Sequence, residues 1–299
     1  MRAPEISFYD WQHQFATEAA CVTHLAQLRW PAGFQCPACG HDHGWLLPSR
    51  TLYECARCHR QTSVTAGTLF HATKLPLTKW FWAIYWVSSD KGSVSALRLS
   101  KLIGVTWHSA YSMLRKLRQA MGHRDTLYRL TEIIELDDAL IGGKRPGKRG
   151  RGAEGKTSVL IACETREGKP GFVAMEQVAA VTLETVGDFA QRRIKPGEEI
   201  RTDALAALSS LGERHHHIAK ITPPEQAQQW LPWVHIVISN LKRFLLGTYH
   251  GISHRYLQEY LDEFAYRFNR RFWEPEIPNR LLRLCVEHAP VRLKPEFGA

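Results

Sequence analysis

Two short motifs, Cys36-Pro-Ala-Cys39 and Cys55-Ala-Arg-Cys58, decide the fold of the first part of this chain. Each motif presents two thiolates from one tight turn, and Gly40 can supply the positive φ that the first turn needs. Two such motifs, fifteen residues apart, can close a tetrahedral four-thiolate site around one zinc ion. We therefore predict a zinc ribbon over residues 31–66, with two strands between the motifs. A disulfide pair or four unrelated buried thiols are the alternatives.

The cysteine count and the lack of targeting signals favour a metal over disulfides. The seven cysteines are an odd number, and Cys21, Cys163 and Cys285 lie in apolar stretches typical of core positions. No apolar stretch of a secretory signal follows Met1, and no apolar run is long enough to span a bilayer. We expect a cytoplasmic, reduced protein with no membrane partner, in which paired cysteines more often bind metal.

The charge of the chain indicates a polyanionic partner. Its 299 residues can form two or three compact units. The formal net charge is +10 and the pI about 9.4, a balance that favours nucleic acid. A merely soluble basic protein is the alternative.

Residues 1–30 and 67–125 are predicted to be mainly helical. Apolar residues recur near a helical period in the first segment. In the second, Ser93 is a candidate N-cap for a short helix, which a turn at Gly104 separates from a longer one. This layout is typical of a DNA-binding helix-turn-helix, although an ordinary helical hairpin with a solvated basic face has the same pattern. The predicted DNA-contacting side chains of the longer helix are Arg115, Lys116 and Arg118.

Residues 126–272 are predicted to form an α/β domain, followed by a C-terminal tail over 273–299. Strands are expected at 132–137, 157–163, 171–175, 199–203 and 217–221, with an amphipathic helix over 182–193 and helices to about residue 270. A Gly-rich basic loop over 144–151 either holds DNA backbone or is simply solvated. Its cationic side chains are Lys144, Arg145, Lys148, Arg149 and Arg151.

Two acids at predicted strand ends, Asp137 and Asp203, are candidate ligands of a divalent metal. A pair of metals can activate water at a phosphodiester and stabilise the leaving oxygen. A third ligand is expected on the helix near residues 233–243, where His235 and Asn240 compete for the role. Lys242 shares a helix face with His235 and could reach a DNA phosphate, as could Arg243. Taken singly, each acid could instead cap a turn, and His235 could be a core histidine.

These residues together resemble the bacterial insertion-sequence transposases of the ISXO-like DDE class, the family often numbered fifteen ninety-five. The resemblance runs from about Trp30 to Arg271 and includes the ribbon, the segment 65–77 and the helix-turn-helix. Its most specific stretches are Glu135-Leu136-Asp137-Asp138 through Ile141-Gly142-Gly143-Lys144, then Thr202-Asp203-Ala204, then Gly247-Thr248-Tyr249-His250 and Glu263 to Arg271.

The resemblance implies a multidomain protein with an α/β ribonuclease-H-like catalytic domain. It implies that Asp137 and Asp203 are catalytic and that Lys242 follows the third ligand. Many relatives carry a Glu seven residues before this Lys, where this chain has His235, which implies a DDH-type site. Some relatives use Asn, so Asn240 is the alternative third ligand. It further implies one structural Zn2+, catalytic Mg2+ or Mn2+ (two ions), and a bacterial, nucleoid-associated enzyme. The expected partners are terminal inverted repeats, target DNA and a second copy of the chain.

The implied activity is metal-dependent hydrolysis at the ends of the element, followed by joining of the 3′-OH ends to target DNA. Two other functions fit the same residues. A DNA-binding protein with an inactive nuclease-like domain would fit the missing third carboxylate. A metal-dependent nuclease that does not transpose would differ only in lacking strand transfer.

Overall fold

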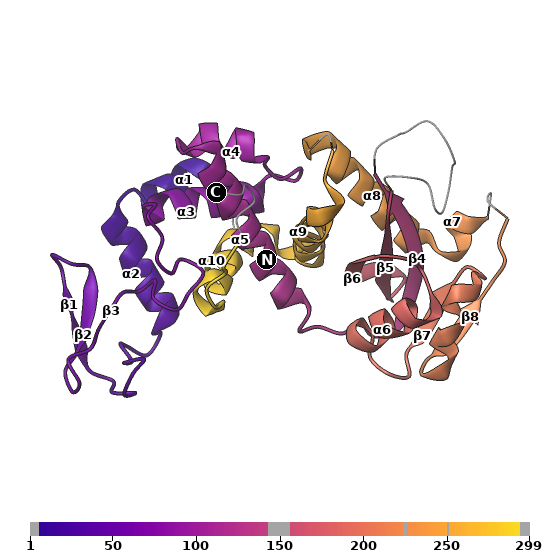
Figure 1. The fold of residues 1–299 in the computed structure, drawn as a ribbon, viewed down its shortest axis with the longest axis horizontal. Coiled ribbons are helices and arrows are strands. Elements are labelled where there is room, and N and C mark those ends of the chain that lie inside the picture. The colour runs from indigo at the N-terminus through magenta and orange to yellow at the C-terminus, as the bar shows by residue number, and fades with distance from the viewer. Residues whose placement is uncertain (1–5, 143–155, 224–225, 250, 294–299) are drawn as a thin grey trace. The chain divides into compact units, whose positions relative to one another are not determined.

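The computed structural model describes residues 6–142, 156–223, 226–249 and 251–293, which fall into two compact units. The first unit contains residues 1–120 and 273–299, and the second contains residues 121–272. Figure 1 shows the elements of both. Within the described ranges, no helix combines the length and the apolar character that a bilayer span requires.

The first unit is a helical core that carries the ribbon. Its helices are α1 (Phe8–Gln14), α2 (Glu18–Arg29), α3 (Leu77–Ser89), α4 (Ala96–Ile103), the larger part of α5 (Trp107–Asp125) and α10 (Ile277–Glu287). Trp11, Phe15 and Phe81 pack edge to face at its centre, and the Trp11 indole donates to the Phe81 carbonyl (3.0 Å). Seven aromatic and aliphatic residues of α3 are buried in this core, because that helix is apolar on most of its surface.

Part of the segment predicted as a C-terminal tail over 273–299 belongs to this core. Residues Arg271–Glu276 form a 3₁₀ turn (η3), and α10 then packs against α2 and α3. The Leu69 amide donates to the Cys285 carbonyl at 2.9 Å, which ties α10 to the segment after the ribbon. The apolar period of α10 buries Leu281, Leu282 and Cys285, and this burial holds the helix in the core.

A helix-turn-helix layout is present in α4 and α5, but its cap differs from the predicted one. Ser95 caps α4 by accepting from the Arg98 amide (3.2 Å), whereas Ser93 has φ 64° and is buried before the helix. Gly104 ends α4 in the left-handed region, as expected for a turn between two helices. Helix α4 and the larger part of α5 belong to the same compact unit as α1, α2, α3 and α10.

The second unit is built on a mixed five-stranded sheet of order β6-β5-β4-β7-β8. Its strands are β4 (Ile133–Ile141), β5 (Thr157–Arg166), β6 (Lys169–Val178), β7 (Glu199–Thr202) and β8 (His216–Ala219). The first three pair antiparallel, and β7 and β8 then add parallel to β4 and to each other. This mixed α/β arrangement fits the ribonuclease-H-like fold that the family resemblance implies.

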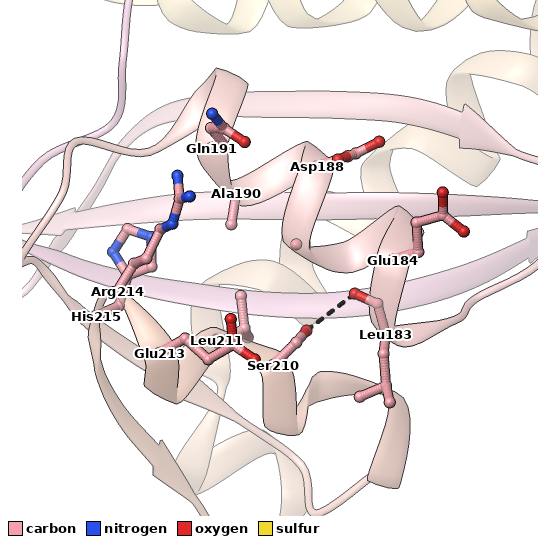
Figure 2. A pocket seen from close by; sticks show the side chains of 11 residues that line it. Leu183, Glu184, Asp188, Ala190, Gln191, Ser210, Leu211, Glu213, Arg214 and His215 are labelled. Carbon is pink, nitrogen blue, oxygen red and sulfur yellow. Dashed lines mark hydrogen bonds between the residues drawn. The ribbon is translucent and has the colours of Figure 1, made fainter.

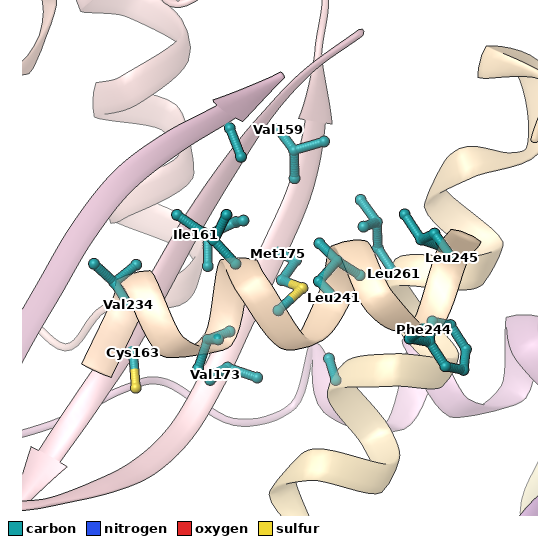
Figure 3. Close-up of a cluster of buried hydrophobic side chains, with 14 of the residues drawn as sticks. Val159, Ile161, Cys163, Val173, Met175, Val234, Leu241, Phe244, Leu245 and Leu261 are labelled. Carbon is teal, nitrogen blue, oxygen red and sulfur yellow. The ribbon is translucent and has the colours of Figure 1, made fainter. Parts of the chain in front are cut away.

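Helices cover both faces of this sheet. On one face, α6 (Leu183–Arg193) and the 3₁₀ helix η1 (Ala206–Glu213) pack on Ile134 and Leu136. On the other, α8 (Pro232–Tyr249) and α9 (Leu257–Asn269) pack on Ala139 and residues of β5 and β6 (Figure 3). The shorter elements are α7 (Ala227–Trp230) and η2 (His254–Tyr256). Because side chains alternate along a strand, the odd-numbered residues of β4 face α8.

Candidate active site and structural zinc site

The four predicted zinc ligands converge in the first unit. The Sγ atoms of Cys36 and Cys58, and those of Cys39 and Cys55, lie 3.6 Å apart, and all four lie within 4.8 Å of one another. Four thiolates about 2.3 Å from one zinc ion would be separated by about 3.8 Å in a tetrahedron. The donor set and its spacing therefore fit a structural Zn2+, and the four side chains are free thiols rather than disulfides.

The two Cys-x-x-Cys turns have the same backbone design. In each, the amide four residues after the first Cys donates to its carbonyl (Gly40 to Cys36, 2.9 Å; His59 to Cys55, 3.0 Å). Gly40 has φ 70°, as predicted, and His59 takes the equivalent place with φ 55°. The strands β1 (Gly44–Leu47), β2 (Leu52–Cys55) and β3 (Gln61–Thr62) complete an antiparallel ribbon, with one strand more than predicted.

The register of the second unit's sheet places Asp137 and Asp203 side by side. Glu135 on β4 pairs with Arg201 on the parallel strand β7. Asp137 lies two residues further along β4, and Asp203 directly follows Thr202, the last residue of β7. Neighbouring strands are about 4.8 Å apart, so the continuation of this register brings the two acids near each other. Asp137 is inside β4, which continues to Ile141, and not at its end as predicted. It lies two residues beyond Glu135, the last residue of β4 that pairs with β7.

The backbone around the two acids is held by local hydrogen bonds. Asp203 accepts from the Leu205 amide (3.2 Å), and the Trp230 indole donates to the carbonyl of Thr202 just before it (2.8 Å). Asp137 accepts from the Asp138 amide (2.8 Å). Asp137 is thus held within β4 and Asp203 in the turn after β7, and both side chains are partly exposed.

His235 comes to the same place from α8. Its Nδ1 lies 3.9 Å from Oδ2 of Asp137, and the two side chains are 32% and 15% exposed. Burial lowers the pKa of His235 below its ordinary value, and the nearby Asp203 carboxylate opposes that effect. The imidazole is therefore mainly neutral at pH 7, the form in which its nitrogen can bind a metal.

These three groups are neighbours but are spread more widely than the ligands of one ion. Among the described residues, only the four cysteines meet the 4.8 Å spacing of a single metal shell. A two-metal site is wider, because its ions are themselves about 3.5–4 Å apart. The two carboxylates and the imidazole fit hard divalent ions such as Mg2+ or Mn2+ in their donor chemistry.

The other residues of the predicted site lie further along α8. Lys242 is exposed and follows His235 by two turns on the same face, whereas Asn240 lies about 140° round the helix from His235. A cavity of ≈ 830 Å³ adjoins Lys242, and Lys156 and His254 contribute further cationic or titratable groups to its lining. Arg243 is exposed, and its Nε donates to the Ser239 carbonyl (3.4 Å).

Two of the predicted DNA contacts on α5 do not fit the structure. Arg118 is 1% exposed and Arg115 8% exposed, so both guanidinium groups lie in the protein interior, where DNA cannot reach them. Lys116 is partly exposed, with its Nζ 6.0 Å from the Trp80 ring. The first turn of this helix is exposed, and there Trp107 is 41% exposed and stacks on Tyr111. The basic loop residues Lys144, Arg145, Lys148, Arg149 and Arg151 lie outside the described residues.

A second cavity lies on the other face of the sheet. It has a volume of ≈ 320 Å³ and lies between α6 and η1, lined by Glu184, Asp188 and Glu213 among others (Figure 2). The Ser210 hydroxyl donates to the Leu183 carbonyl across it at 3.0 Å (Figure 2). Since α6 and η1 cover the face opposite α8, this cavity is separate from the acids and His235.

One residue of the site was missed by sequence reasoning. Glu135 is 3% exposed and accepts from the amides of Trp233 and Val234, at the start of α8, at 2.8 Å each. Burial raises the pKa of Glu135, and these two hydrogen bonds oppose the effect. A lone acid between apolar residues of a predicted strand was the signal that could have identified it, because an ionisable group at such a position needs partners.

Comparisons with known proteins agree with the order of the zinc ribbon and the α/β unit along the chain. A transposase zinc-ribbon domain matches residues 16–61, and an ISXO2-like transposase domain matches residues 129–269. An uncharacterized protein in transposable element ISH50 of Halobacterium salinarum is 23% identical over 275 residues, which cover 85% of this chain and 91% of that protein.

Two solved structures with partial similarity are complexes of Mos1. The Mos1 strand transfer complex has a TM-score of 0.33 and 11% identity, covering 67% of this chain and 75% of that one. The Mos1 paired-end complex with left transposon end has a TM-score of 0.31 and 11% identity, covering 63% and 72%. The two matching domains, in the order that the structure shows, identify the chain as a member of the IS1595 family of transposases, with an N-terminal zinc ribbon.

Proposed function

We propose that this chain cuts DNA at the ends of an insertion sequence and joins the freed 3′-OH ends to target DNA. The observation that supports this most strongly is the meeting of Asp137, Asp203 and His235 on two adjacent strands and one helix. Phosphodiester hydrolysis and strand joining use the same in-line displacement, so one such site can perform both.

Each side chain has a proposed role. The Asp137 and Asp203 carboxylates and the neutral His235 nitrogen would hold the divalent ions, with Asn240 the alternative third ligand. When bound, such ions would activate the attacking water or 3′-OH and stabilise the leaving oxygen. The protein itself would align the scissile phosphate, because catalysis of this kind depends on positioning and charge stabilisation.

DNA is proposed to approach along α8. Lys242 and Lys156 flank the cavity beyond the acids, where they can neutralise backbone phosphates. Arg243 and the basic loop over 144–151 would extend this contact. The exposed first turn of α5, rather than Arg115 and Arg118, is the part of the helix-turn-helix that we propose for contact with the terminal repeats.

The test is cleavage of duplexes that carry the inverted repeats flanking the gene. With Mg2+ or Mn2+, we expect nicking at the repeat boundary and, with added plasmid, joined products. Asp137→Asn and Asp203→Asn should each abolish both, while duplex affinity stays within about twofold. Asp188→Asn, an acid on the opposite face of the sheet, is the matched control and should cut normally. Normal cutting by either Asp137→Asn or Asp203→Asn would refute the assignment.

The third ligand is tested separately. His235→Ala should lose metal-dependent cutting and Asn240→Ala should keep it; the reverse pattern would move the role to Asn240. Two ends must be brought together for joining, so we also propose that two copies of the chain act in one complex, which light scattering with end duplexes can measure.

A DNA-binding protein with an inactive nuclease-like unit is the second candidate. The observation that favours it is the imidazole at the third position, which leaves the site with one negative charge fewer than a site of three carboxylates. Tight, metal-independent binding of the repeats without cutting in either metal would support this candidate over the first.

A further inference from the structure

The first turn of α8 has no cap of its own. Leu231 precedes the helix with an apolar side chain, and Pro232 at the first position has no N–H. The first intrahelical bond runs from the His235 amide to the Leu231 carbonyl (3.4 Å). The amides of Trp233 and Val234 therefore need an acceptor from elsewhere in the fold.

Glu135 is that acceptor. Its Oε2 takes both amide bonds at 2.8 Å, while Thr165 donates to its Oε1 (3.4 Å). The carboxylate comes from the middle of the sheet and lies at the positive end of the α8 dipole, where a negative charge is favoured. With only 3% of its surface exposed, it is screened from water, so the geometry of these bonds is closely defined.

The position of Glu135 connects two parts of the candidate site. Glu135 and Asp137 project from the same face of β4, two residues apart. The two amides that Glu135 holds belong to the residues directly before His235. One side chain thus links the strand of the first carboxylate to the turn that carries the imidazole.

We propose that Glu135 is a positioning residue, which holds the imidazole of His235 at the right distance from Asp137 for the two to share the metal site. This inference rests on the proposed function, because it assigns Glu135 a role in the same site. Glu135 touches neither metal nor DNA in this role and acts through the first turn of α8.

A matched control is available within the same sheet. Glu164 is also fully buried and also accepts two backbone amides, from Thr131 (2.8 Å) and Phe172 (3.0 Å). It pairs with Ile134, whose side chain belongs to the core on the opposite face from α8. Its removal should destabilise the unit in a similar way without moving His235.

The test compares Glu135→Ala, Glu135→Gln and Glu164→Ala in the zinc-loaded full chain. Hydrogen exchange should show protected amides at Trp233 and Val234 in the wild type and Glu135→Gln, and loss of protection in Glu135→Ala only. Mn2+ titrated alone, with the free ion followed by electron paramagnetic resonance, should bind about 10- to 100-fold more weakly to Glu135→Ala. Glu135→Gln keeps an acceptor oxygen and should recover most of that affinity. If Glu135→Ala does not fold, Glu135→Asp, one methylene shorter, replaces it.

The outcomes separate this inference from the proposed function. The inference is overturned if Glu164→Ala weakens Mn2+ binding as much as Glu135→Ala, or if the two amides stay protected without Glu135. If the wild type shows protected amides and Glu135-dependent Mn2+ binding but never cuts DNA, the proposed function fails and the positioning role stands.

Discussion

Replacing Asp262 by Asn is expected to stabilise the second unit most at alkaline pH and by a smaller amount in mild acid. Asp262 lies on α9, and its carboxylate occupies the space left by the missing side chain of Gly122. The Gln258 amide donates to its Oδ1 at 2.8 Å. Burial raises the pKa of Asp262 to about 7, with a smaller contribution from Asp125 and Glu259; Gln258 and Arg193 oppose the shift.

The sign and size of the effect follow from this pKa. The carboxyl titrates near 3.8 in the unfolded chain and near 7 in the folded protein, so the folded state binds the proton more tightly. The associated stability is complete below about pH 4 and is lost as the pH rises through about 7. The full loss of stability is about 4 kcal/mol, because each unit of difference between the two pKa values corresponds to about 1.36 kcal/mol. Asn cannot ionise and keeps an oxygen for Gln258, so it should recover about 2–4 kcal/mol at pH 8.5.

The assay is urea unfolding at pH 5 and pH 8.5. Hydrogen exchange of the β5 amides is the readout, because these amides report on the second unit alone. Asp188→Asn, an exposed acid of the same unit, is the control and should change stability by less than about 0.5 kcal/mol at both pH values. The reasoning is wrong if Asp262→Asn stabilises the unit equally at both pH values, or not at all at pH 8.5.

Three further results are expected. Zinc removal by a chelator should unfold β1 to β3 while the β5 amides of the second unit keep their protection, as measured by hydrogen exchange. Gly40→Ala should cost the ribbon about 1–2 kcal/mol because of its φ of 70°, and His59→Gly should cost none; zinc competition against a coloured chelator measures both. Asp125→Ala should destabilise the second unit by about 3–5 kcal/mol in urea unfolding, because the buried Arg270 loses its carboxylate partner. In the wild type, Nη1 of Arg270 lies 2.8 Å from Oδ1 of Asp125. A destabilisation below about 1 kcal/mol would contradict this expectation.

Local patterns predicted most of the elements. The cysteine spacing predicted the ribbon, and the predicted strands and the helix over 182–193 match β4 to β8 and α6 to within a few residues. In the structure Thr182 caps α6 through a reciprocal pair of bonds with Thr185. These features depend on residues close together in the chain, so a single sequence is sufficient to identify them.

The errors concern burial and distant packing. Arg115 and Arg118 look like exposed cations on a helix, yet the α5 side that carries them faces the interior. The segment after residue 272 carries an apolar helical face, but which surface it covers depends on α2 and α3, which lie near the start of the chain. A periodic pattern shows which side of a helix is apolar and cannot show which partner buries it.

The sequence by itself determined the zinc ribbon, because its four ligands lie within one short segment and two turns bring them together. It also named Asp137, Asp203 and His235 as candidates. Only the tertiary structure decided that these three meet, because that depends on the parallel register of β4 with β7 and on where α8 begins. Glu135 fixes where α8 begins by accepting hydrogen bonds from Trp233 and Val234, which follow it by about a hundred residues in the chain. No local sequence pattern encodes such a contact.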